Sequence, residues 1–218
     1  MHKNILIGFV VAILALSSAA VVMAEDADVA TLRAKAEKGD TDAQYRLGLM
    51  YANGRGVPRN YAEAVKWYRK GAEQGDALAQ KGLGLMYQDG LGVPKVYTEA
   101  VKWYRKAAEQ GDDRAQFILG ELHKDGKVVV KDFAEAVKWY RKAAEQGYDK
   151  AQCKLGDMYE FGRGVAQDYV QAYLWCNLAA AQGNEDATKN RDILEKKMTP
   201  EQIAEAQNLA LEWRPKKS

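Results

Sequence analysis

Apolar residues recur along the chain at the spacing of amphipathic helices, and the whole pattern returns after about 36 residues. A tryptophan recurs at the same position of each repeat: Trp67, Trp103, Trp139 and Trp175. A fixed period in this range is typical of stacked-repeat proteins. One unit is too small to bury its own apolar face, so neighbouring units stack on one another. The pattern therefore predicts an all-α fold, a solenoid of helix-turn-helix repeats.

Each repeat predicts two helices. The first helix of the first repeat places Ala43, Leu47 and Tyr51 on one face, and the second buries Trp67 while charged residues face water. Gly48 lies inside the first helix, where glycine costs about 1 kcal/mol relative to alanine. We therefore expect another stretch of backbone to come close to this glycine.

The loops and helix starts also repeat. A Gly-x-Gly-Val loop ends the first helix in three repeats, because glycine supplies the positive φ of a tight turn. The third repeat has Val128 in place of the second glycine, so either its loop follows a different path or Val128 is strained. Asn60 and Glu63 have the spacing of a capping box at the start of the second helix. The equivalent pairs are Asp132 with Glu135 and Asp168 with Gln171.

The repeat divides the chain into segments. These are a leader (1–24), an N-terminal capping helix (25–40), four repeats (41–76, 77–112, 113–148 and 149–184), and C-terminal capping helices with a tail (185–218). In the fourth repeat a stripe that is charged elsewhere becomes apolar with Leu174 and Leu178. We expect the amphipathic helix that begins at Thr199 and Pro200 to cover this stripe.

The N-terminus is typical of an export signal. Lys3 precedes an apolar run, and Ala24 offers a small residue for cleavage. The chain is then expected to be periplasmic or secreted, with no membrane span after cleavage. The alternative is an uncleaved segment that anchors the chain in the inner membrane, because the run is close to the length of about 20 residues that a span needs.

Composition and charge argue against several classes of function. A net charge of +2, with 28% charged residues, gives no reason to expect nucleic acid as a partner. Beyond the leader, Ser218 is the only serine and His123 the only histidine, so a Ser-His-acid triad is not available. No Cys/His spacing indicates a metal site, and no cofactor motif occurs. We predict a non-enzymatic protein without catalytic, cofactor or metal residues, in which His123 replaces a packed tyrosine.

Two cysteines lie one on each helix of the fourth repeat. Cys153 and Cys176 are equidistant from the middle of the intervening loop, so they stand at the same height in an antiparallel pair. The same two positions hold Tyr45 with Tyr68, Lys81 with Tyr104, and Phe117 with Tyr140 in the other repeats. Two of these three pairs are aromatic, which suggests contact. Either a disulfide joins them, worth about 3 kcal/mol for a loop of this size, or they are two buried free thiols.

The motif A-x-x-x-L-G-x-x-Y-x-x-G-x-G-V, followed by D/N-Y-x-x-A-x-x-W-Y-x-x-A-A-x-x-G, resembles the Sel-one-like repeat (SLR) of tetratricopeptide-like proteins. The segment from Met198 to Trp213 is similar to the ending of many bacterial exported members. The resemblance implies a right-handed α-solenoid whose first helices line the concave side, and a scaffold or adaptor role in the bacterial envelope. His123 and Val128 depart from the family pattern.

Two functional hypotheses follow. The second helices are nearly constant between repeats while the first helices vary, so a protein partner on the concave surface is the leading hypothesis. The candidate contacts are Leu49, Asn53, Leu85, Asp89, Glu121, Asp125, Asp157 and Phe161, unless these positions are simply tolerant surface. The alternative is an acidic polysaccharide or other envelope polyanion bound by rows of lysines. These are Lys66, Lys102 and Lys138, and Lys70, Lys106 and Lys142, although the interleaved glutamates favour a salt-bridged surface.

Overall fold

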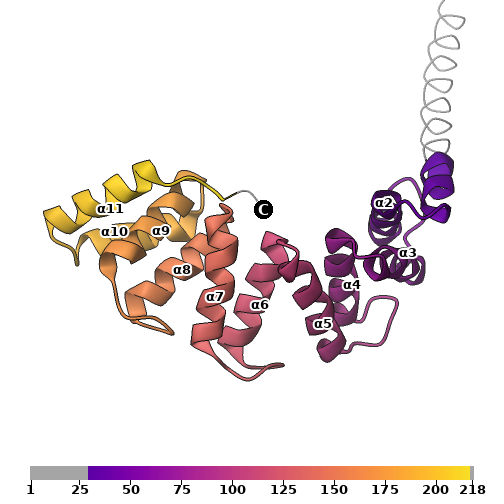
Figure 1. The fold of residues 1–218 in the computed structure, drawn as a ribbon, viewed down its shortest axis with the longest axis horizontal. Helices are drawn as coiled ribbons and strands as arrows, with labels where there is room; N and C mark the ends of the chain where they lie inside the picture. The colour runs from indigo at the N-terminus through magenta and orange to yellow at the C-terminus, as the bar shows by residue number, and fades with distance from the viewer. Residues whose placement is uncertain (1–28, 217–218) are drawn as a thin grey trace, which may run out of the picture. The chain divides into compact units, whose positions relative to one another are not determined.

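The computed structural model describes residues 29–216, and all regular secondary structure in this range is helical (Figure 1). The chain divides into two compact units after Val96, and we call their described parts the N-terminal unit (29–96) and the C-terminal unit (97–216). The N-terminal unit contains the N-terminal helix (residues 29–37), α2 (Thr41–Asn53), α3 (Tyr61–Glu73) and α4 (Ala77–Asp89). The C-terminal unit contains α5 (Tyr97–Glu109), α6 (Asp113–Asp125), α7 (Phe133–Glu145), α8 (Asp149–Phe161), α9 (Tyr169–Ala181), α10 (Glu185–Glu195) and α11 (Pro200–Glu212). The prediction of an all-α fold of helix pairs is confirmed; the proposed leader lies outside the described residues.

The helices of a repeat pack face to face around a glycine. α2 lies against α3, α6 against α7 and α8 against α9. A Cβ atom on Gly48 would lie 2.6 Å from the ring of Tyr68, which leaves no room for any side chain. Our expectation of a close backbone was wrong for this residue, because the side chain of the second helix fills the space. In the fourth repeat Cys176 replaces the tyrosine, and its Sγ would lie 2.6 Å from a Cβ on Gly156.

The loop of the third repeat takes its own path. The second loop glycine has a φ of +71° at Gly92 and +73° at Gly164, and each lies against the backbone of the preceding repeat's second helix. Among the described residues no residue other than glycine has a positive φ, so Val128 is unstrained. The alternative of a different path is therefore confirmed. Val130 in this loop is 86% exposed.

Only half of the predicted capping box forms. The Asn60 side chain accepts from the Glu63 N–H at 3.1 Å, but the Glu63 carboxylate pairs with Lys66. The reason is that the Asn60 N–H already donates to the Tyr51 carbonyl, so it has no need of the glutamate. A complete capping box occurs at Thr199 and Gln202, where α11 begins.

Buried glutamines tie the first helix of one repeat to the second helix of the preceding one. Their amide nitrogens donate to alanine carbonyls: Gln44 to Ala36, Gln80 to Ala72, Gln116 to Ala108 and Gln152 to Ala144, at 2.9–3.2 Å. In three of them the side-chain oxygen accepts from a second glutamine: Gln74, Gln146 and Gln182, at 2.7–2.8 Å. These bonds satisfy a polar group that would otherwise be costly to bury. They also set the spacing between successive repeats within each unit.

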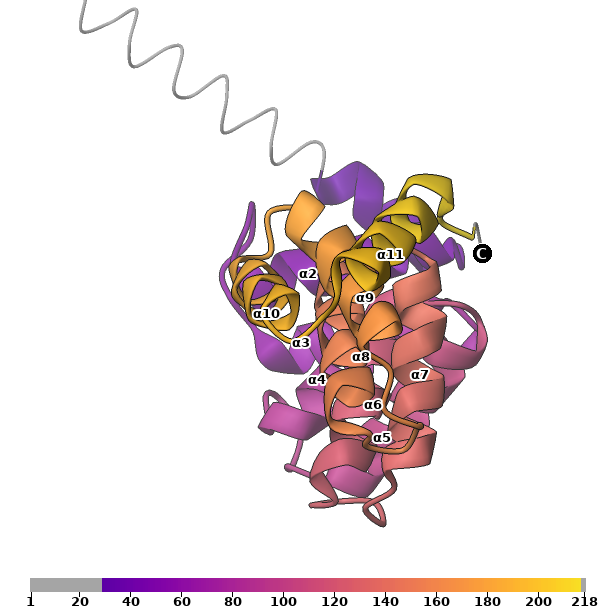
Figure 2. The ribbon, with the colours of Figure 1, turned by 90° about the vertical axis from the view of Figure 1, so that its left-hand side faces the viewer.

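The C-terminal helices close the core of the C-terminal unit. α10 packs against α9, and Ala187 occupies the place that Ala151 has in α8. α11 lies across α9 (Figure 2), with Trp213 edge-on to Trp175 at 6.4 Å between ring centroids. Leu174 is 6% exposed. Leu178 is partly buried against the core cluster that contains Trp175, as is Trp213. The prediction that the tail covers the apolar stripe of the fourth repeat is confirmed.

Candidate functional site

The eight predicted partner-binding residues lie on the first helices of the repeats. We call Leu49, Asn53, Leu85 and Asp89 the first-helix face of the N-terminal unit, and Glu121, Asp125, Asp157 and Phe161 the first-helix face of the C-terminal unit. The two faces use the same repeat positions but differ in their chemistry.

The face of the N-terminal unit exposes two leucines beside two polar residues. Leu49 is 40% exposed and Leu85 is 36% exposed, and Asn53 and Asp89 are exposed beside them. Leu78, at the start of α4, is 40% exposed as well. Three large apolar side chains are therefore exposed on α2 and α4.

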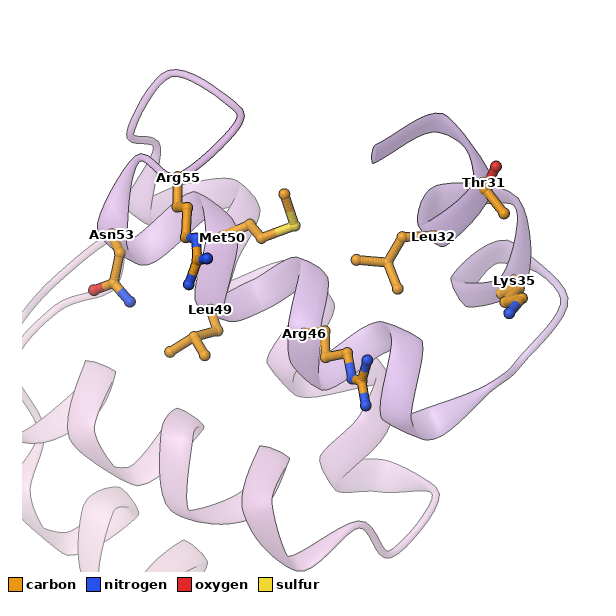
Figure 3. A pocket seen from close by; sticks show the side chains of 8 residues that line it. All are labelled: Thr31, Leu32, Lys35, Arg46, Leu49, Met50, Asn53 and Arg55. Carbon is orange, nitrogen blue, oxygen red and sulfur yellow. The ribbon is translucent and has the colours of Figure 1, made fainter. Parts of the chain in front are cut away.

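Leu49 and Asn53 also line a pocket between the N-terminal helix and α2 (Figure 3). Its volume is about 560 Å³, and its remaining lining residues are Thr31, Leu32, Lys35, Arg46, Met50 and Arg55. Leu32 extends from the N-terminal helix toward Met50 of α2. The cationic lining residues Lys35, Arg46 and Arg55 are not among the candidates predicted from the sequence. The repeat positions of Arg46 and Arg55 nevertheless vary between repeats, as the position of Leu49 does.

The face of the C-terminal unit is charged and satisfied by its own neighbours. Glu121 pairs with Lys124 at 2.8 Å and accepts a hydrogen bond from the Tyr140 hydroxyl. Burial and the Glu121 carboxylate raise the pKa of Tyr140, so this hydroxyl stays protonated and donates. Lys124 also forms an ion pair with Asp125, at 3.5 Å.

The segment that follows the repeats supplies further partners for the carboxylates of the fourth repeat. Asp157 pairs with Lys154 at 3.4 Å and accepts from the side-chain amide of Asn190 in α10 at 2.7 Å. Burial raises the pKa of Asp157 above its ordinary value. Glu160 is only 6% exposed and pairs with Lys197 at 2.7 Å. Segments that follow the repeats thus cover part of the fourth repeat, while Phe161 stays 55% exposed.

The lysine rows on the second helices have partners within the chain. Lys66, Lys102 and Lys138 pair with the glutamates three residues earlier, Glu63, Glu99 and Glu135. The ammonium groups of Lys70, Lys106 and Lys142 lie 4.2–4.5 Å from the ring centroids of Trp67, Trp103 and Trp139. These contacts favour the salt-bridged surface over a polyanion site.

Cys153 and Cys176 are free, buried thiols in the structure. Burial raises the pKa of Cys153 to about 11, and burial raises the pKa of Cys176 as well, with a further contribution from Cys153. Neither thiol is therefore an activated nucleophile at neutral pH. The disulfide stays a prediction.

His123 occupies a tyrosine position that makes a recurring hydrogen bond. Elsewhere an arginine of the preceding second helix donates to this hydroxyl: Arg33 to Tyr51, Arg69 to Tyr87 and Arg141 to Tyr159. Both ring nitrogens of His123 are buried without a partner in the described part of the chain. A general acid or base must reach its substrate, and this imidazole has no such access.

The described residues contain no cluster of three or more His, Cys, Asp or Glu side chains that could hold a metal ion. Within residues 29–216, no helix has the length and apolar character needed to cross a membrane.

Stacked helix pairs with variable first-helix faces define a helical-repeat scaffold protein. The Sel1 repeat model matches residues 41–76, 77–112, 113–148 and 149–184. The chain therefore belongs to the Sel1 repeat family, whose members are typically non-catalytic. No curated protein sequence matches the chain.

Solved structures share this fold. A protective antigen of uropathogenic Escherichia coli strains with an SLR fold is 45% identical, with a TM-score of 0.78, over 85% of this chain and 40% of that one. A Sel1 repeat protein from Oxalobacter formigenes is 42% identical, with a TM-score of 0.65, over 69% of this chain and 62% of that one. An immunity protein from Pseudomonas aeruginosa is 22% identical, with a TM-score of 0.51, over 84% and 72% of the two chains, and shows the fold alone. The chain thus spans less than two thirds of the length of each of the first two relatives.

Proposed function

We propose that the protein is a non-enzymatic scaffold of the bacterial cell envelope that binds a protein partner on its first-helix faces. The observation that carries this proposal is the pair of exposed leucines, Leu49 and Leu85, at a repeat position that is charged in the other two repeats. Stacked-repeat proteins bind their partners on the surface lined by such helices. The envelope location rests on the export-like pattern of residues 1–24.

The leucines are the main contacts in this proposal. A few residues that lose contact with water supply most of the binding energy of a protein interface, and burial of exposed leucine side chains is favourable. The carboxylates of the C-terminal unit already have internal partners, so a ligand would have to displace those bonds to use them. We therefore assign the first-helix face of the N-terminal unit as the principal surface.

The test is retention of envelope material by the immobilised protein after washing at low and at high salt. The double variant Leu49→Asp with Leu85→Asp should lose a discrete protein that the unaltered chain retains in high salt, because carboxylates replace the apolar anchors. The matched control is Val130→Asp with Leu211→Asp, which changes two residues that are 86% and 73% exposed elsewhere. It should retain the protein.

Loss of all bound material in high salt, or recovery of carbohydrate alone, would contradict the proposal and favour the polyanion alternative. Screening weakens contacts between exposed charges and leaves a packed apolar interface largely intact. Equal loss in the test and control variants would also contradict it.

A further inference from the structure

We propose that the pocket between the N-terminal helix and α2 binds an acidic–aliphatic peptide segment, in which an aspartate or glutamate is adjacent to a leucine-like side chain. This inference rests on the proposed function and specifies the chemistry that the partner must present at one end of the first-helix face of the N-terminal unit. Figure 3 shows the lining side chains.

The charge of the pocket selects for an anion. Lys35, Arg46 and Arg55 line it, and none of its described lining residues is acidic. Arg46 contacts Asp42 through its Nε at 2.9 Å, but both side chains are more than 60% exposed, and such surface pairs hold little free energy. A guanidinium has five donors, so most of those on Arg46 remain for a carboxylate. Arginine also matches the planar geometry of a carboxylate better than lysine does.

The apolar part of the pocket selects for a hydrocarbon side chain beside that anion. Leu32, Leu49 and Met50 come from two helices and lie next to the cations. A methionine adapts its shape to different apolar ligands. The volume of about 560 Å³ lies within the range of about 300–1,000 Å³ that is typical of ligand sites. It has room for a few side chains rather than for a whole helix.

The cationic part and the apolar part of the pocket together favour a peptide over other anions. A polysaccharide or an inorganic anion would leave the three apolar side chains exposed to water, and a purely apolar segment would desolvate the cations without a partner. A carboxylate next to an aliphatic side chain would pair with the cations and also cover the apolar side chains. Complementary charge would also orient the partner on the adjoining leucines.

The test is fluorescence anisotropy of a labelled, end-blocked peptide, Gly-Glu-Leu-Asp-Leu-Gly, titrated with the purified full chain. Binding should weaken by at least about ten-fold when both acidic residues become lysine, and likewise when both leucines become serine, because either change removes one half of the recognition. A salt titration should weaken binding of the original peptide.

The protein variants are matched in charge. Arg46→Glu with Arg55→Glu should weaken binding by at least about ten-fold. Arg59→Glu with Lys66→Glu makes the same change in net charge at exposed residues outside the pocket and should alter binding by less than about two-fold. Circular dichroism of all variants should show unchanged helix content.

The inference would be overturned by equal binding of the lysine peptide, by equal losses in the two double variants, or by no binding of the acidic peptide. These results leave the proposed function standing if Leu49→Asp with Leu85→Asp still abolishes retention of the envelope protein. The proposed function fails separately if that leucine variant retains it.

Discussion

The two units carry the same repeat but display different first-helix faces. The repeat position of Leu49 is an exposed leucine in α2 and α4, the two first helices of the N-terminal unit. The same position is Glu121 and Asp157 in the C-terminal unit. Those two carboxylates are bound by lysines, a tyrosine and a residue of the capping helix α10. Similar packing of the helix pairs therefore supports two different faces: one exposes leucines, and the other carries carboxylates that have partners within the chain. The buried glutamines and the Gly–aromatic contacts keep the scaffold constant while these exposed positions vary.

The largest expected effect concerns the cysteines, which exist only in the C-terminal unit. If the chain is exported to an oxidising compartment, Cys153 and Cys176 should form a disulfide, and reducing it should lower the free energy of unfolding by about 3 kcal/mol. Intact mass after denaturation and alkylation measures the bond. Labelling of both thiols without a reductant would contradict the prediction and match the free thiols of the structure.

The second-largest effect is expected where the end of α11 packs against α9. Trp213→Ala should lower the free energy of unfolding in urea by about 2 kcal/mol, because a half-buried ring loses its edge-on contact with Trp175. Leu211→Ala, near the end of α11, is the control, and since Leu211 is 73% exposed its effect should stay within about 0.5 kcal/mol. A loss within about 0.5 kcal/mol for Trp213→Ala would contradict the claim that its contact with Trp175 stabilises the unit.

A gain in stability is expected in the third repeat. His123→Tyr should raise the free energy of unfolding by about 1 kcal/mol, since it removes two unsatisfied buried nitrogens and gives Arg105 the hydroxyl acceptor that Arg69 and Arg141 have. For a chain of this size the melting temperature should rise by about 2–4 °C. A lower melting temperature would show that the cavity fits histidine and excludes tyrosine.

The smallest effect depends on pH. Burial raises the pKa of Asp157 in the folded state, so the folded chain binds a proton more readily than the unfolded chain. The stability of the unaltered protein relative to Asp157→Asn should therefore increase as the pH falls from neutrality toward 3.8, the ordinary pKa of this carboxyl group. Urea unfolding at several pH values measures the difference. A difference that decreases with falling pH would show that the lysine contact dominates over burial.

Much of the fold could be predicted because its signals are periodic. The tryptophans, the loop glycines and the Thr199–Pro200 helix start each specify local structure that depends little on distant parts of the chain. For the third loop the sequence is compatible with two alternatives, a different path or a strained Val128, because a valine at a glycine position does not specify the backbone that the loop adopts. The family match agrees with the repeat pattern.

The candidate site was less predictable because it depends on contacts between elements. The variable positions 49 and 85 are visible in the sequence, but Arg46 and Arg55 become parts of one pocket only when the N-terminal helix is placed beside α2. Likewise, nothing in the local sequence shows that Asn190, from the capping segment, satisfies Asp157. The recurring Ala-Gln dipeptide was a visible signal for the buried glutamine bonds, yet the acceptors lie eight residues earlier, in another helix.

The most direct test of the account is photo-crosslinking in cells from matched repeat positions. A photoreactive amino acid is placed at Leu49 or Leu85 in the N-terminal unit, and at Glu121 or Asp157 in the C-terminal unit. We expect a discrete protein adduct from the two leucine positions and little or none from the two carboxylate positions. Adducts of equal yield from all four positions, or adducts from the carboxylate positions alone, would contradict the claim that the N-terminal unit carries the principal binding surface.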